Sequence, residues 1–130
     1  MRIQRLDHFG LEVSDLARAE SFYTQTLGME VVTRIGKEQV LLRCGDAVLA
    51  LFHVPGKPPG GPQTLADRIH NPLGKGHHAF QVALADWNEA RRRFQREGTP
   101  VHDPIDWGDH DCLYFLDPDG NLLELVCYRE

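Results

Sequence analysis

The sequence contains no apolar run long enough to cross a membrane. None approaches the roughly 20 consecutive apolar residues that a spanning helix needs. Residues 1–8 carry a charge every two or three positions, so they lack the apolar stretch of a signal peptide. These absences predict a cytoplasmic protein without a membrane partner.

Cysteine and positive charge are also scarce. The three cysteines, Cys44, Cys112 and Cys127, form no close pair and no CxxC motif. This suits a reducing compartment and argues against both a disulfide framework and a thiolate zinc site. The formal net charge is −5, and no basic run is longer than the arginine triplet at 91–93, which lies in a helical stretch. Nucleic acid is therefore not expected as a partner.

What the chain does contain is regular alternation. Residues 5–13 place Phe9, Leu11 and Val13 on one side and His8 on the other, which predicts a half-buried strand. A helix is expected from position 14 or 15 to about 27, and a glycine at 28 ends it. The strands expected next cover residues 29–35, 38–44 and 47–54.

The same pattern then starts again. Residues 77–82 repeat residues 8–13 at an offset of 69 positions, and a helix containing Trp87 and Phe94 ends at Gly98. The strands expected after this helix cover residues 99–103, 111–117 and 121–128, with a hairpin turn at 117–121. A Pro- and Gly-rich linker separates the copies at residues 55–76, in which 64–72 could form a short helix.

The repeat predicts an α+β fold made of two tandem βαβββ modules, residues 1–54 and 77–130, within one domain, 1–130. A module this small cannot cover its own sheet, so two modules are expected to pair and form an eight-stranded cup.

A pair of histidines stands at equivalent places in the repeat. A lone histidine in a strand is more often structural than a ligand, but His77 takes the position in the second module that His8 takes in the first. Beside them on the same strand face lie the small residues Gly10 and Ala79, which leave space above the sheet. His78 should then face the helix, although a shift of one residue in register would exchange it with His77.

Glu124 completes the candidate site. It alternates with Leu123 and Leu125, and it shares its face with Leu122 and Val126, where an unpaired carboxylate would be costly to bury. A bound cation would remove that cost. Two imidazoles and one carboxylate form a facial triad with open coordination positions, so a divalent metal is expected on His8, His77 and Glu124.

Three motifs give the chain a family resemblance: "LDHFGLEVSDLARAESFYTQTLGMEVV", "HHAFQV" and "YFLDPDGNLLELV". Together they resemble the vicinal oxygen chelate superfamily, which includes glyoxalase I, fosfomycin-resistance thiol transferases, methylmalonyl-CoA epimerase, extradiol dioxygenases and bleomycin-resistance proteins. The resemblance covers essentially the whole chain. It implies a metal in the cup that is chelated by adjacent oxygens of the substrate, at positions that match His8, His77 and Glu124.

The resemblance argues against glyoxalase I itself. Those enzymes carry a further glutamate in the last strand of the first module, which also moves the proton, and the matching position here is Ala50. A shift by one residue gives Leu49, which cannot bind a metal either. Glu12 faces the cup and could substitute, but a solvated or salt-bridged role is favoured for it. The same gap counts against an epimerase.

Three metal ligands, with no residue at the fourth ligand position, match the extradiol dioxygenases and the thiol transferases. The dioxygenase resemblance gives Tyr114 the role of hydrogen-bond donor beside the metal, but their usual histidine is out of place, which leaves His110 as a candidate acid or base. Thiol transferases have a threonine at the position of Gly10 and a basic segment where this chain has 104–107. Fosfomycin is therefore not the expected substrate, while Trp107 either stacks on an apolar substrate or packs.

The sequence thus predicts a metal-dependent enzyme of the glyoxalase/dioxygenase group that acts on a small molecule, with a thiol as a candidate co-substrate. The ligand set suits Fe, Mn, Ni, Co or Zn. The alternative is a metal-free drug-binding protein of the bleomycin-resistance type. The resemblance also implies that two modules pair to form the cup, and the linker at 55–76 is long enough for pairing within one chain or by exchange between two chains. A homodimer with exchanged modules is expected, in which each site takes His8 from one chain and His77 with Glu124 from the other.

Overall fold

The computed structural model describes residues 1–56, 69, 72–73 and 75–130, which divide into two compact units at Pro59/Gly60. This division falls in the predicted linker. The helix expected at 64–72 lies outside the described residues apart from positions 69 and 72. No helix that the structure describes is long and apolar enough to cross a membrane.

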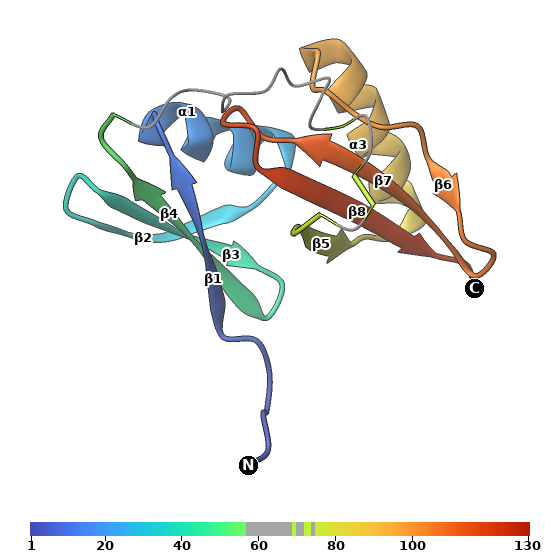
Figure 1. Ribbon diagram of the computed structural model, residues 1–130, viewed down its shortest axis with the longest axis horizontal. Coiled ribbons are helices and arrows are strands. Elements are labelled where there is room, and N and C mark those ends of the chain that lie inside the picture. The colour runs from blue at the N-terminus through green and yellow to red at the C-terminus, as the bar shows by residue number, and fades with distance from the viewer. Residues whose placement is uncertain (57–68, 70–71, 74) are drawn as a thin grey trace. The chain divides into compact units, whose positions relative to one another are not determined.

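The first module is a four-stranded sheet crossed by a short helical segment (Figure 1). Its strand order is β1-β4-β3-β2, and β1 and β4 are parallel while the other pairs are antiparallel. The elements in chain order are β1 (His8–Val13), α1 (Leu16–Ser21), the π-helical turn η1 (Phe22–Thr26), β2 (Glu30–Ile35), β3 (Gln39–Cys44) and β4 (Ala47–His53).

Local chemistry explains where this helical segment begins and ends. The Asp15 side chain accepts a hydrogen bond from the backbone N–H of Arg18 at 3.0 Å, which caps the first turn. At the other end the chain passes through Gly28, whose φ of 75° is in the region that favours glycine. The expected helix at 15–27 is therefore confirmed in position, although its second half is a π-helical turn.

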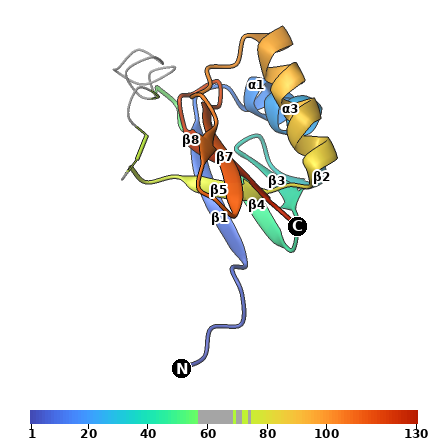
Figure 2. The same ribbon diagram turned by 90° about the vertical axis from the view of Figure 1, so that its right-hand side faces the viewer.

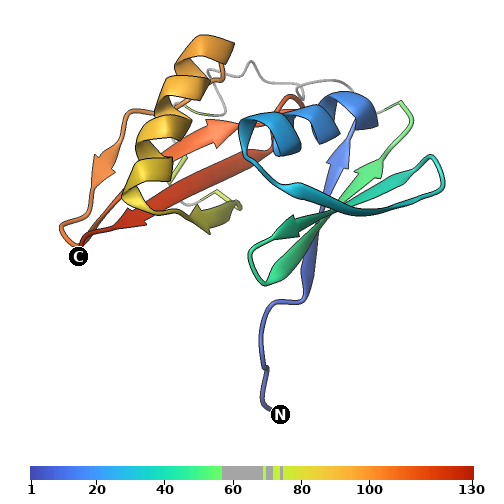
Figure 3. The ribbon, with the colours of Figure 1, turned by 180° about the vertical axis from the view of Figure 1, so that it is seen from behind.

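The second module has the same topology. Its strand order is β5-β8-β7-β6, again with the first pair parallel. The elements are β5 (His78–Gln81), α3 (Leu84–Glu97), β6 (Ile105–Asp106), β7 (His110–Leu116) and β8 (Leu122–Tyr128). Seen from behind and edge-on, α3 lies across one side of this sheet (Figures 2 and 3). Two βαβββ modules are thus confirmed.

One predicted strand is wrong. Residues 99–103 do not form a strand; Val101 makes a single bridge to Phe115, and the edge strand β6 starts only at Ile105. Pro100 lies within this stretch and Pro104 follows it, and proline has no N–H to donate to a neighbouring strand.

Each sheet buries one face against its own helix. In the first module the buried residues of β1 are Leu11 and Val13, so His8 and Gly10 lie on the opposite face. In the second module Phe94 of α3 packs on Phe115, with ring centroids 4.7 Å apart. Tyr114 and Glu124 therefore lie on the face away from α3. We call the face of each sheet away from its helix the histidine face.

Candidate metal and substrate site

The histidine face of the second module brings two of the predicted ligands together. Ala79 pairs with Glu124 across β5 and β8, which puts His77, two residues earlier, on the same face. The Nε2 atom of His77 lies 3.8 Å from Oε1 of Glu124. Glu124 is only 9% exposed, so the carboxylate sits in a mostly apolar setting, as its sequence neighbours predict.

A hydrogen bond at the other ring nitrogen, Nδ1, selects the tautomer of the neutral His77 imidazole. Nδ1 lies 2.6 Å from the carbonyl oxygen of Lys75. A carbonyl can only accept, so Nδ1 carries the proton and donates it. In the neutral ring, Nε2 then presents a lone pair towards a carboxylate oxygen. Two acceptors that face each other at this distance suit a cation between them, and a backbone-held Nδ1–H is the usual support of a metal-binding histidine.

His78 points elsewhere. It pairs with Leu123, which is fully buried on the side of α3. Burial, and secondarily the neighbouring His77, lowers the pKa of His78, so its neutral form is favoured. His77 and not His78 is thus the histidine beside Glu124.

Tyr114 is a hydrogen-bond donor to the Glu124 carboxylate. Tyr114 pairs directly with Glu124 across β7 and β8, and its ring meets that of His77 edge-on at 5.1 Å. Burial, and then the charge of Glu124 and a hydrogen bond to it, raises the pKa of Tyr114 to about 12. The phenol therefore stays protonated at neutral pH and acts as a donor.

Cys112 is the site residue that the sequence interpretation missed. It lies two residues before Tyr114 on the same face, and burial, with a smaller contribution from Glu124, raises the pKa of its thiol. The indole Nε1–H of Trp107 donates to its Sγ at 3.1 Å. The signal in the sequence that points to Cys112 is the period-two alternation of β7, which puts it on the same face as Tyr114.

His8 lies at the start of β1 in the first module, with a side chain 62% exposed. Its Nδ1 lies 2.7 Å from Oδ2 of Asp7. The hydrogen bond to His8 lowers the pKa of Asp7, so this carboxylate is an acceptor that leaves Nε2 of His8 available as a ligand. Within either module by itself, the described residues include no group of three His, Cys, Asp or Glu side chains that could hold a metal.

Comparison with known proteins identifies the family. The model of the Glyoxalase/Bleomycin resistance protein/Dioxygenase superfamily matches residues 5–125. The chain belongs to this superfamily. It is 31% identical over 127 residues to glutathione transferase FosA of Serratia marcescens, and this alignment covers 95% of this chain and 80% of that protein. It is 32% identical over 124 residues to biphenyl-2,3-diol 1,2-dioxygenase 3 of Rhodococcus globerulus, and this alignment covers 93% of this chain but only 62% of that enzyme.

Solved structures agree with this assignment. The lactoylglutathione lyase of Agrobacterium tumefaciens is 27% identical, with a TM-score of 0.71, and the match covers 97% of this chain and 95% of that one. A glyoxalase/dioxygenase of Nostoc punctiforme has a TM-score of 0.77 at 22% identity and covers 98% of this chain and 92% of that one, a likeness that shows the fold alone. The predicted family and fold are both confirmed.

Within this superfamily fold, the histidine face of the first module is apolar at its centre. Gly10 pairs with Ala50, so Ala50 and not Leu49 lies on this face. Ala50 is 3% exposed, and a methyl group cannot bind a metal. A Cβ atom on Gly10 would lie 3.0 Å from Cε2 of Phe52, so the ring of Phe52 fills the place where a threonine side chain would begin.

His110 and Trp107 lie at the far end of the second module's histidine face. His110 is four residues from Tyr114 along β7, which separates their Cα atoms by roughly 13 Å. The His110 ring is stacked between Trp107, at 6.5 Å, and Tyr128, at 4.8 Å, and its Nδ1 is 2.5 Å from Oδ1 of Asp109. His110 is therefore not adjacent to Glu124.

Proposed function

We propose that the protein is a metal-dependent enzyme that acts on a small molecule with two adjacent oxygen atoms. The observation that carries the proposal is the His77–Glu124 pair, whose facing Nε2 and Oε1 atoms are 3.8 Å apart with Nδ1 tied to the backbone. In the proposal His8 is the third ligand, on the strength of its equivalent place in the repeat. The similarity to a glutathione transferase and a dioxygenase supports an enzymatic role.

The metal would supply Lewis acidity or activate oxygen, and Fe, Mn, Ni, Co and Zn all suit the ligands. The chain's own residues would orient the reaction. Tyr114 would keep its proton on Oη and donate a hydrogen bond to Glu124 or to a substrate oxygen. Cys112, held by Trp107, would keep the Glu124 carboxylate in place, while the apolar neighbours Leu122 and Leu116 would exclude water.

Within the superfamily, the residues favour a dioxygenase or a thiol transferase over a lactoylglutathione lyase. The isomerase reaction needs a base at the substrate carbon, and Ala50 offers none. A thiol co-substrate fits the similarity to a glutathione transferase. His110 would serve as acid or base only towards the far end of a substrate that extends past Cys112, and the exposed Trp107 ring would contact an aromatic or apolar group there.

Metal analysis of anaerobically purified protein tests the proposal. The expected result is about one divalent ion per chain, lost for the most part in His8→Ala, His77→Ala and Glu124→Ala. His78→Ala is the matched control, because His78 lies on the other face and should keep the metal. Full metal content in His77→Ala, or loss of metal in His78→Ala only, would contradict the ligand set. Metal-free protein that still binds small aromatic drugs would point to the bleomycin-resistance type instead.

We also propose a homodimer in which each site combines His8 of one chain with His77 and Glu124 of the other. Mixing the His8→Ala and Glu124→Ala proteins tests this arrangement under conditions that exchange subunits. In a mixed dimer one site is intact and the other carries both changes, so each mixed dimer should bind about half as much metal as the wild type. An equal mixture with free exchange should therefore recover about a quarter of the wild-type level. Mixed dimers that recover no metal would place each site within one chain.

A further inference from the structure

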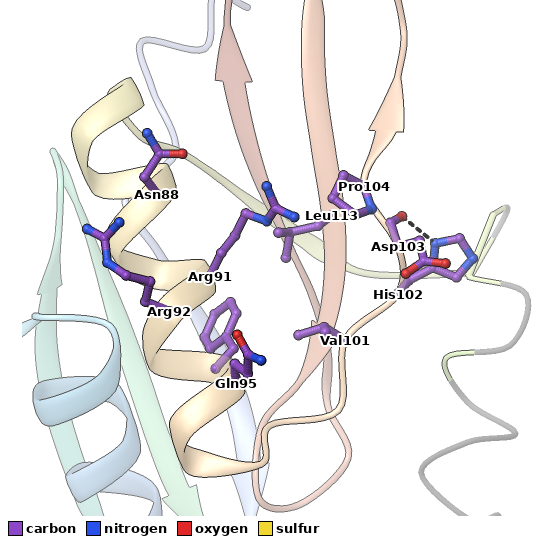
Figure 4. A pocket seen from close by; sticks show the side chains of 10 residues that line it. Asn88, Arg91, Arg92, Gln95, Val101, His102, Asp103, Pro104 and Leu113 are labelled. Atoms are coloured by element: carbon purple, nitrogen blue, oxygen red, sulfur yellow. Dashed lines mark hydrogen bonds between the residues drawn. The ribbon is translucent and has the colours of Figure 1, made fainter.

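The second module contains a cavity of about 460 Å³ that the proposed metal site does not use. It lies on the α3 side of the sheet, between α3, the segment 101–104 and Leu113 of β7 (Figure 4). Leu113 and Tyr114 are successive residues of one strand, so they face opposite sides of the sheet. The cavity is therefore behind the histidine face and separated from Glu124 by the sheet.

The floor of this cavity is apolar and its rim is polar. Phe94 and Leu113 are almost fully buried, and Val101 and Pro104 complete the apolar surface. Its volume lies at the small end of the range of known ligand pockets. The polar groups at the rim come from α3 and from the segment that follows it: Asn88, Arg91, Arg92, Gln95, His102 and Asp103.

Arg91 differs from the other arginines of α3. Glu89 binds Arg92 at 3.0 Å, Arg93 at 3.0 Å and Arg96 at 3.6 Å. Arg91 makes no ion pair or hydrogen bond with any residue that the structure describes. Figure 4 shows its side chain extending from α3 towards Leu113, whereas Arg92 points to the other side of the helix. An unpaired guanidinium above an apolar floor is suited to a carboxylate that carries an apolar group.

We propose that this cavity is a second ligand site, which binds a small carboxylic acid with an aromatic or branched apolar body. Arg91 binds the carboxylate, and the body rests on Phe94, Val101 and Leu113. The Asn88 and Gln95 amides can donate to the same carboxylate from the neighbouring turns of α3. The Asp103 carboxylate on the opposite rim repels an anion, so the acid must sit nearer to α3.

The probe for the test is 3-phenylpropionate, and the measurement is an NMR shift titration of the metal-free 130-residue chain. The expected result is saturable binding, with shifts centred on Arg91, Gln95 and Val101. Arg91→Gln should weaken binding about tenfold or more, because the charged hydrogen bonds are lost. Arg96→Gln is the matched control, since Arg96 pairs with Glu89 and does not line the cavity, and its affinity should stay within about twofold of the wild type.

Further variants and ligands separate this site from the proposed metal site. Glu124→Ala should bind the probe as the wild type does, whatever its metal content, and Asp103→Asn should bind it more tightly. The neutral amide, 3-phenylpropionamide, should bind at least about tenfold more weakly than the acid. Equal affinity of Arg91→Gln and wild type, equal affinity of acid and amide, or no saturable binding would overturn the assignment. Tighter binding of a short peptide with a C-terminal phenylalanine would also overturn it, in favour of a chain end.

Discussion

The two modules have one topology but differ in the residues at the centre of their histidine faces. In the first, Gly10 of β1 pairs with Ala50 of β4, and Leu41 of β3 pairs with Ala50 on the other side. In the second, Ala79 pairs with Glu124, and Tyr114 pairs with Glu124 on the other side. Ala50 and Glu124 are therefore equivalent positions, and so are Leu41 and Tyr114.

This difference shows that two modules with one topology can differ in the polar groups that they bury. The second module carries a buried carboxylate together with two groups that donate hydrogen bonds to it, Tyr114 and Cys112. The first module has a small apolar centre, and His8, its equivalent of His77, is at an exposed strand end. Such polar groups are tolerated in the interior only as a connected set.

The largest expected effect comes from placing a carboxylate in the first module. Ala50→Glu should lower the free energy of unfolding by about 3 kcal/mol at pH 7 in metal-free protein, because Ala50 is 3% exposed and has Leu41 where Glu124 has Tyr114. Urea unfolding measures it, with Ala50→Gln as the isosteric neutral control.

The pH dependence of the same variant sharpens the comparison. Burial raises the pKa of such a carboxyl above its unfolded value, so its destabilisation is present at high pH and relieved as the pH falls through the folded pKa. The difference between Ala50→Glu and Ala50→Gln should therefore shrink between pH 7 and pH 5. If Ala50→Glu is as stable as the wild type at pH 7, the centre of the first module's histidine face is not apolar.

The next effect concerns the donor to Glu124. Tyr114→Phe removes the hydroxyl group that donates a hydrogen bond to the buried Glu124 carboxylate. It should lower the free energy of unfolding of the metal-free protein by about 2 kcal/mol. Tyr128→Phe is the control. That residue is 50% exposed, and its substitution should change stability by less than about 0.5 kcal/mol. Equal effects of the two changes in chemical denaturation would show that Tyr114 does not support Glu124.

The smallest effect tests the space above the first sheet. Gly10→Thr brings a Cβ atom to 3.0 Å from the Phe52 ring, which is partly exposed and can shift. A double-mutant cycle with Phe52→Ala should give a coupling energy of about 1 kcal/mol, with Gly10→Thr better tolerated when the ring is absent. A coupling near zero would mean that Phe52 does not occupy the space beside Gly10.

Much of the fold was predictable from local patterns. Alternation along β1 and β8 located the strands, and Gly28 and Gly98 located the helix ends, because these features depend on neighbours within a few residues. The strand expected at 99–103 was wrong because its pattern resembled a strand, while Pro100 within it and Pro104 after it have no N–H to donate to a neighbouring strand. The distinction between His77 and His78 followed from the register of β5 against β8.

The sequence by itself determined the repeat, the family and the face of each strand, since chemical alternation and motif spacing are written along the chain. Only the tertiary structure decided how the side chains of the second module meet. Three features depend on distances between groups and on which partners compete for them. They are the hydrogen bond from His77 Nδ1 to the Lys75 carbonyl, the hydrogen bond from Trp107 to Cys112, and the lack of an ion pair for Arg91 among the described residues. Those distances are set by strand pairing and helix packing, which no local pattern contains.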